Sequence, residues 1–93
     1  MKDIKELRQE IDGIDREILE LFEKRMEISE RMASYKQKEG LPVQDKAREK
    51  EKIQQVQSLT HTAFNREHIE ELYTVLISLS RKLQEEQIKT SLQ

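Results

Sequence analysis

Arg25 is the residue whose position says most about the chemistry of this chain. It interrupts an apolar stripe whose members follow one another at alternating spacings of three and four, as on one packed face of a long helix. The ten positions are Ile4, Leu7, Ile11, Ile14, Ile18, Leu21, Arg25, Ile28, Met32 and Tyr35. A guanidinium on a buried stripe is costly unless an anion meets it. Either a carboxylate elsewhere in the protein pairs with Arg25, or the protein binds an anionic ligand there.

Two further cations lie on the same predicted helix. Lys36 follows Arg25 by eleven residues, so both side chains project from nearly the same face, roughly 16 Å apart along the axis. Such a pair can grip opposite ends of a small ligand. Arg8 precedes Arg25 by seventeen residues, roughly 25 Å along the axis, which no small molecule bridges. If Arg8 serves the same ligand, it must therefore come from another chain.

Polar residues also gather on two later segments. The first set shares one helical face by its spacings of three, four and seven, and comprises Asp45, Arg48, Glu49 and Lys52. The second set is Ser80 and Gln84, which border an apolar stripe and can supply neutral hydrogen bonds to a bound molecule. Each also has a structural interpretation: a helix cap for Asp45, and solvated or ordinary helix positions for the others.

The elements that must position these residues are three helices in one all-α domain spanning residues 1–93. The first is expected over about residues 3–39, from an N-cap at Asp3 to a stop at Gly40 before Pro42. At roughly 55 Å it exceeds the width of a compact monomer of this size, so it needs a partner along its length.

The two later helices are shorter. The second is expected over about residues 45–59, with Asp45 as N-cap, and the third over about residues 65–88, with Asn65 as N-cap. A loop at 60–64 separates them, and residues 89–93 are expected to form a frayed tail.

Composition supports a core shared between chains and excludes several function classes. Charged residues make up 39% of the 93 residues and hydrophobic residues only 34%, which is little for a self-sufficient core. The net charge is −2 with no basic patch, so we expect no nucleic-acid partner. There is no cysteine, and His61 and His68 lack a third ligand, so we expect no metal site. Without a signal region or an apolar span, a cytoplasmic protein with no membrane partner is expected.

Four segments match one known family in sequence. They read LRQEIDGIDREILELFEKR (7–25), ASYK (33–36), LPVQDKARE (41–49) and ISLSRKLQ (77–84). The chain resembles the all-helical chorismate mutases over nearly its whole length. The matched polar positions are Arg8, Arg25, Lys36, Asp45, Arg48, Glu49, Ser80 and Gln84. The resemblance implies an intertwined helical homodimer that converts chorismate to prephenate, in phenylalanine and tyrosine biosynthesis, without metal or organic cofactor.

The resemblance also implies roles for the matched residues. Arg25 and Arg8 of the partner chain would pair with the two carboxylates of chorismate. Lys36 would donate to the ether oxygen, whose bond to carbon breaks, and to a carboxylate. Gln84 would donate its amide N–H to the same ether oxygen.

The remaining matched positions would complete the pocket. Glu49 and the backbone near Asp45 would take the ring hydroxyl of chorismate. Arg48 and Ser80 would contact the remaining carboxylate edge or organise the site. The apolar walls would include Met32 and Ile77.

Two alternatives remain open at this point. Some relatives with a similar pocket act on chorismate or isochorismate by removing pyruvate. The other alternative is a non-catalytic helical domain of a fused or partner enzyme. As a dimerisation domain it would suit the heptad spacing of the first helix, although it would not explain Arg25 on the stripe. As a ligand-sensing domain it would bind prephenate or chorismate as a signal.

Overall fold

The computed structural model describes residues 3–92 and consists, over that range, of three helices without strands. The first, α1, spans Ile4–Glu39. Its N-cap is Asp3, whose carboxylate accepts a hydrogen bond from the backbone N–H of Glu6 at 2.9 Å. It ends at Gly40, which adopts a left-handed conformation with φ of 69° that favours glycine. The predicted bounds of this helix are confirmed.

The second helix, α2, spans Lys46–Leu59, and Asp45 caps it as predicted. The third, α3, spans Ala63–Ser91 and differs from the prediction at both ends. Its N-cap is Thr62 and not Asn65, because the Thr62 hydroxyl accepts from the backbone N–H of Asn65 at 3.3 Å. The N-cap therefore lies three residues earlier than expected.

The C-terminal end of α3 is longer than predicted. The expected frayed tail at 89–93 is wrong as far as Ser91, which is the last residue of the helix. The Ser91 hydroxyl donates to the side-chain oxygen of Gln37 on α1 at 2.9 Å, and this contact anchors the last turn. Gln93, the end of the predicted tail, lies outside the described residues.

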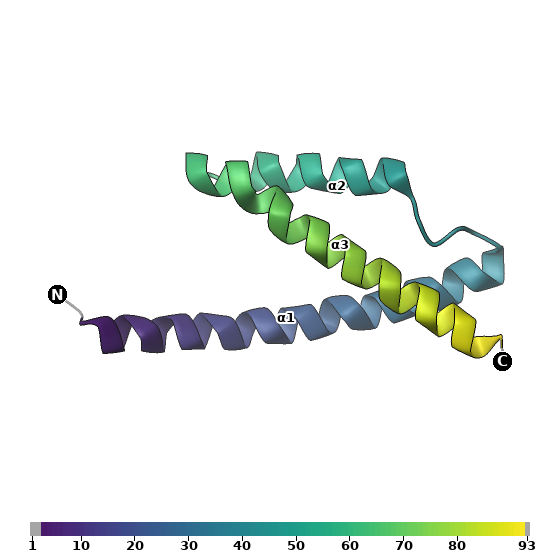
Figure 1. The fold of residues 1–93 in the computed structure, drawn as a ribbon, viewed down its shortest axis with the longest axis horizontal. Coiled ribbons are helices and arrows are strands. Elements are labelled where there is room, and N and C mark those ends of the chain that lie inside the picture. The colour runs from purple at the N-terminus through teal and green to yellow at the C-terminus, as the bar shows by residue number, and fades with distance from the viewer. Residues whose placement is uncertain (1–2, 93) are drawn as a thin grey trace.

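The three helices form an open arrangement in which α3 is the common partner. It crosses the C-terminal half of α1 and packs along α2, while α1 and α2 do not approach each other closely within residues 3–92. The N-terminal half of α1 extends away from both (Figure 1). The molecule measures 57 × 26 × 14 Å.

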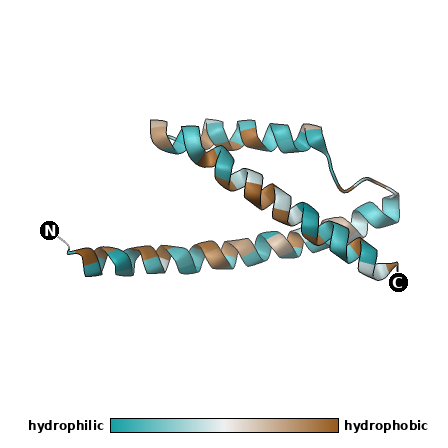
Figure 2. Cartoon of the chain, viewed as in Figure 1, coloured by the Kyte–Doolittle hydropathy of each residue, from teal (hydrophilic) through white to brown (hydrophobic). Residues whose placement is uncertain are grey.

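Within residues 3–92, the apolar stripe of α1 is left about half-exposed. Ile14 and Ile18 are each 55% exposed and Leu21 is 64% exposed. Ala33 and Val56 are the buried hydrophobic residues of the described chain, so a single copy has almost no core. Hydrophobic positions recur along the whole length of α1 (Figure 2). An apolar face of this length is typical of a protein interface, in agreement with the predicted homodimer, which itself stays a prediction.

No helix within residues 3–92 combines the length and the apolar character needed to cross a membrane. The cytoplasmic location expected from the sequence stays a prediction.

Candidate active site

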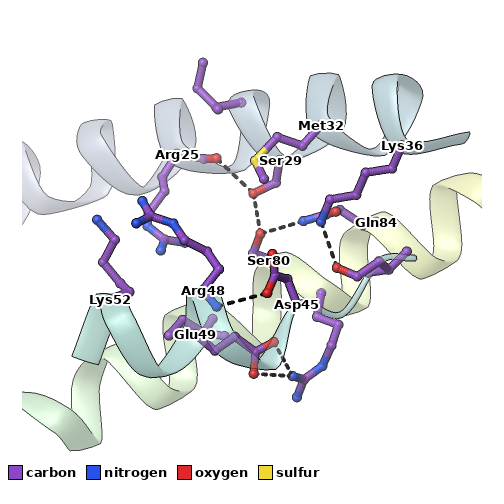
Figure 3. Close-up of a pocket in the computed structure, with 14 residues that line it drawn as sticks. Arg25, Ser29, Met32, Lys36, Asp45, Arg48, Glu49, Lys52, Ser80 and Gln84 are labelled. Atoms are coloured by element: carbon purple, nitrogen blue, oxygen red, sulfur yellow. Dashed lines mark hydrogen bonds and ion pairs between the residues drawn. The ribbon is translucent and has the colours of Figure 1, made fainter. Parts of the chain in front are cut away.

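A cavity of about 290 Å³ lies where the three helices converge. Seven of the eight predicted site residues line it, and Figure 3 shows them projecting toward one another from α1, α2 and α3. These seven are Arg25, Lys36, Asp45, Arg48, Glu49, Ser80 and Gln84. Met32 and Ile77 also line the cavity, as predicted. Helical spacing brings the α1 residues together. The packing of α3 against α1 adds the α3 residues, and the packing of α2 along α3 adds those at the start of α2.

Arg8 is the one predicted site residue that does not line the cavity. It is exposed on the N-terminal half of α1, roughly 25 Å along the axis from Arg25. No element within residues 3–92 brings Arg8 closer to the cavity. A role for Arg8 in this site therefore requires a second copy of the chain.

Arg25 has no acidic partner among residues 3–92. Its Nη1 donates to the backbone oxygen of Leu76 on α3 at 3.4 Å, a long hydrogen bond, and no carboxylate of the described chain lies within ion-pair distance. The guanidinium is partly buried and faces the cavity (Figure 3). Of the two explanations for a cation on this stripe, the internal salt bridge is absent from the described residues. Most of its donors are left for an anionic ligand.

Lys36 is held over the cavity by the connection between α1 and α2. Its ammonium donates to the backbone oxygen of Val43 at 2.7 Å. The left-handed turn at Gly40 reverses the chain so that Val43 comes back beside the last turn of α1. One of the three ammonium protons is engaged, and two remain for a ligand.

On α2, Asp45 is committed to the helix end and the neighbouring cations are weakly held. The Asp45 carboxylate accepts from the backbone N–H of Arg48 at 3.0 Å. The Arg48 guanidinium pairs with Glu51 at 3.3 Å, but both side chains are more than half exposed, so this ion pair contributes little. Lys52, a cavity cation not assigned to the site from the sequence, donates to the neutral side chain of Gln55 at 2.6 Å.

Glu49 is the second cavity carboxylate, and it is fully paired. Nη1 of Arg81 on α3 donates to both of its oxygens, at 3.0 and 2.9 Å. The two side chains are 27% and 29% exposed. Arg81 also lines the cavity, and its place there was not predicted from the sequence.

A chain of buried hydrogen bonds ends on the Gln84 amide. The Ser29 hydroxyl donates to the backbone oxygen of Arg25 at 3.1 Å and lies 2.6 Å from the Ser80 hydroxyl. Ser80 in turn accepts from Nε2 of Gln84 at 3.0 Å. Ser29 and Gln84 are 2% and 3% exposed, and Oε1 of Gln84 is buried without a hydrogen-bond partner. A buried amide oxygen without a partner is costly, so a hydrogen-bond donor from a ligand or a turn of the amide would remove that cost.

The electrostatics of the cavity favour an anion. Five cationic and two anionic side chains line it, a net charge of +3 from one chain. The cations are Arg25, Lys36, Arg48, Lys52 and Arg81, and the acids are Asp45 and Glu49. Within residues 3–92, no group of three histidine, aspartate or glutamate side chains is placed to hold a metal ion.

Ser29 could have been recognised from the sequence, whereas Arg81 could not. Ser29 follows Arg25 by four residues and precedes Lys36 by seven, so helical spacing alone puts it on the cavity face. The contact of Arg81 with Glu49 depends on how α3 faces α2, which no local spacing reports.

Comparison with known proteins identifies the family to which this architecture belongs. The sequence matches the chorismate mutase type II family over residues 7–85, a range that includes Arg8 and every residue lining the cavity. The chain belongs to this family. The resemblance found in the sequence is thereby confirmed, and the type II chorismate mutases provide the framework for interpreting the cavity.

Two relatives contain this type of sequence within longer chains. A bifunctional chorismate mutase/prephenate dehydratase from Aquifex aeolicus (strain VF5) is 35% identical over 95 residues, which cover 98% of this chain and 26% of that protein. The T-protein of Haemophilus influenzae (strain ATCC 51907 / DSM 11121 / KW20 / Rd) is 43% identical over 49 residues, which cover 53% of this chain and 13% of that protein. This chain therefore spans a small part of both relatives. No solved structure matches it significantly.

Proposed function

We propose that this domain is a chorismate mutase, which converts chorismate to prephenate for phenylalanine and tyrosine biosynthesis. The observation that carries the proposal is the combination, in one cavity of a type II family member, of an unpaired partly buried Arg25, Lys36 and the buried Gln84 amide. The cavity charge of +3 suits a dianionic substrate.

The reaction is a Claisen-type sigmatropic rearrangement, which is unimolecular and needs no nucleophile or proton relay. The enzyme has two tasks. It must hold a flexible dianion in its folded, reactive conformer, which removes an entropic barrier. It must also stabilise the negative charge that develops on the ether oxygen as the carbon–oxygen bond breaks.

Lys36 and Gln84 are suited to the second task. The Lys36 ammonium retains two protons beyond its bond to Val43, so one can reach the ether oxygen and another a carboxylate. The Gln84 amide can use its second N–H toward the ether oxygen. Alternatively, a half-turn of the amide lets Oε1 accept from the Ser80 hydroxyl and releases both N–H groups, with the Ser29 hydroxyl then donating to Ser80 in place of the Arg25 backbone oxygen. Either arrangement places a neutral donor beside the developing charge.

Arg25 is suited to the first task, together with Arg8 of a second copy of the chain. A guanidinium matches a carboxylate in a planar, two-bonded geometry, so two arginines can fix both substrate carboxylates. Within this proposal, Glu49 and the backbone near Asp45 take the ring hydroxyl. Arg48 and Ser80 contact the remaining carboxylate edge or organise the site.

The proposal includes an intertwined homodimer. Its support is the exposed apolar stripe of α1, which has no covering partner in one chain, and the distance of Arg8 from the cavity that it would serve. Packing α1 against a second copy would bury the stripe and bring Arg8 toward the partner's cavity.

The test is to incubate the purified protein with chorismate, follow the loss of its diene absorbance, and identify the product by chromatography. We expect conversion to prephenate and a loss of at least about a hundredfold in kcat/KM in Lys36→Ala, because a charge-assisted donor to the reacting oxygen is removed. Lys24→Ala, which removes an exposed lysine of α1 that lies outside the cavity, is the matched control. Release of pyruvate would select the lyase alternative, and a folded dimer without turnover would select a ligand-sensing role.

A further inference from the structure

The ion pair between Glu49 and Arg81 forms part of the wall of the candidate active site. It joins α2 to α3, and its two members also line a second cavity, of about 410 Å³, whose walls come from these two helices. Nη1 of Arg81 donates to both carboxylate oxygens, at 3.0 and 2.9 Å. The orientation of the Glu49 carboxylate is therefore fixed from α3 and not from its own helix.

Two other cations of α2 line the same cavity as Glu49. Arg48 is its neighbour on α2, and Lys52 follows it by three residues, a spacing at which side chains on a helix interact. Among residues 3–92, the Arg48 guanidinium is otherwise engaged only by the exposed Glu51, and the Lys52 ammonium by the neutral Gln55. A Glu49 carboxylate released from Arg81 would turn to these cations and neutralise charge that the site needs for its substrate.

We propose that Arg81 is a positioning residue for the reaction. It holds the Glu49 carboxylate toward the ring hydroxyl of the substrate and away from Arg48 and Lys52, so that these cations stay available to the substrate carboxylates. The inference rests on the proposed chorismate mutase function and adds to it a residue that acts through Glu49 without contacting the substrate.

A double-mutant cycle separates this positioning role from two other roles of Arg81, direct contact with the substrate and a purely structural ion pair. Arg81→Met keeps the bulk of the cavity wall and removes the ion pair. We expect it to lower kcat/KM for chorismate about tenfold or more, with a raised KM. In a Glu49→Gln background, where there is no carboxylate to hold, the same change should cost less than about threefold. Arg81→Lys, which can restore one charged contact, should recover part of the loss. Lys82→Met, on an exposed neighbour of α3, is the matched control for loss of one positive charge.

Each contrary result has a distinct meaning. Equal losses on kcat/KM in both backgrounds would overturn the proposal and show that Arg81 contacts the substrate directly. A lowered melting temperature with unchanged kcat and KM would overturn it in favour of a purely structural ion pair. If the unaltered protein does not turn over chorismate, the proposed function fails and this inference fails with it. If the unaltered protein is active but the losses in kcat/KM from Arg81→Met and Glu49→Gln are additive, this inference is overturned and the proposed function stands.

Discussion

Replacing Arg25 with leucine should separate catalytic activity from folding stability. The side chain is partly buried, its hydrogen bond to the Leu76 oxygen is long at 3.4 Å, and no carboxylate of residues 3–92 balances its charge. Losing so long a bond costs at most about 1 kcal/mol, and an apolar side chain on this stripe offsets that cost. We therefore expect the melting temperature of Arg25→Leu to equal or exceed that of the unaltered protein.

The same change should nearly abolish activity. If the fork of Arg25 makes two charge-assisted hydrogen bonds to a substrate carboxylate, at about 1.5–3 kcal/mol each, its loss removes about 3–6 kcal/mol of binding to the transition state. This corresponds to a fall in kcat/KM of about a hundredfold to ten-thousandfold. The kcat/KM of Arg25→Lys should lie between those of the unaltered protein and Arg25→Leu, because lysine keeps the charge and loses the planar fork.

The assay is a steady-state measurement of prephenate formation beside a thermal melt followed by circular dichroism. Arg16→Leu is the matched control, because Arg16 precedes Arg25 by two and a half turns and lies on the opposite, exposed side of α1. A melting temperature that drops by many degrees in Arg25→Leu, but not in Arg16→Leu, would contradict this prediction. It would mean that a carboxylate of the assembled protein pairs with Arg25.

Three further predictions address the donor to the ether oxygen and the dimer. Gln84→Glu should give a rate that falls as pH rises, because only the protonated carboxyl can donate; a flat profile between about pH 5 and pH 8 would contradict the role of Gln84. Ser29→Ala should lower kcat about fivefold with little change in melting temperature, because it breaks the hydroxyl chain that orients the Gln84 amide; an unchanged kcat would remove that role. Ile14→Asp should halve the mass measured by sedimentation equilibrium and remove activity, because it puts a charge in the middle of the exposed stripe; an unchanged dimer would mean that the chains associate elsewhere.

The ends of α1 and the start of α2 could be predicted because local chemistry decides them. Asp3 and Asp45 each accept a backbone N–H three residues ahead, and Gly40 adopts the left-handed conformation that its position after a long helix suggests. The start of α3 could not be fixed in the same way. Thr62 and Asn65 are both good N-caps three residues apart, and local sequence does not rank them.

The site shows the same division between local and long-range information. Arg25 and Lys36 share a face through the helical repeat alone, so their placement follows from the sequence. The approach of Ser80 and Gln84 to that face depends on how α3 crosses α1, and it was expected through the family resemblance. The pairing of Arg81 with Glu49 depends on the rotation of α3 against α2, and neither spacing nor motif reports it.

The packing partner of the exposed stripe of α1 cannot be learned from a single chain. Its periodicity predicts a packed helix, and its exposure in the structure leaves that packing to be completed. The role of Arg8 also depends on a second copy of the chain, because Arg8 matches the family register yet lies far from the cavity of its own chain.

We propose that the cavity becomes a working chorismate site when a second copy of the chain supplies Arg8. Complementation between two inactive variants tests it most directly. Arg8→Ala and Lys36→Ala proteins are unfolded, mixed in equal amounts and refolded together, with each refolded alone as a control. A mixed dimer then contains one site with an intact Lys36 and an intact Arg8 from the other chain, so we expect recovery of about a quarter of unaltered activity from statistical pairing. A mixture that forms mixed dimers, verified by affinity tags, but stays as inactive as its components would contradict the shared site.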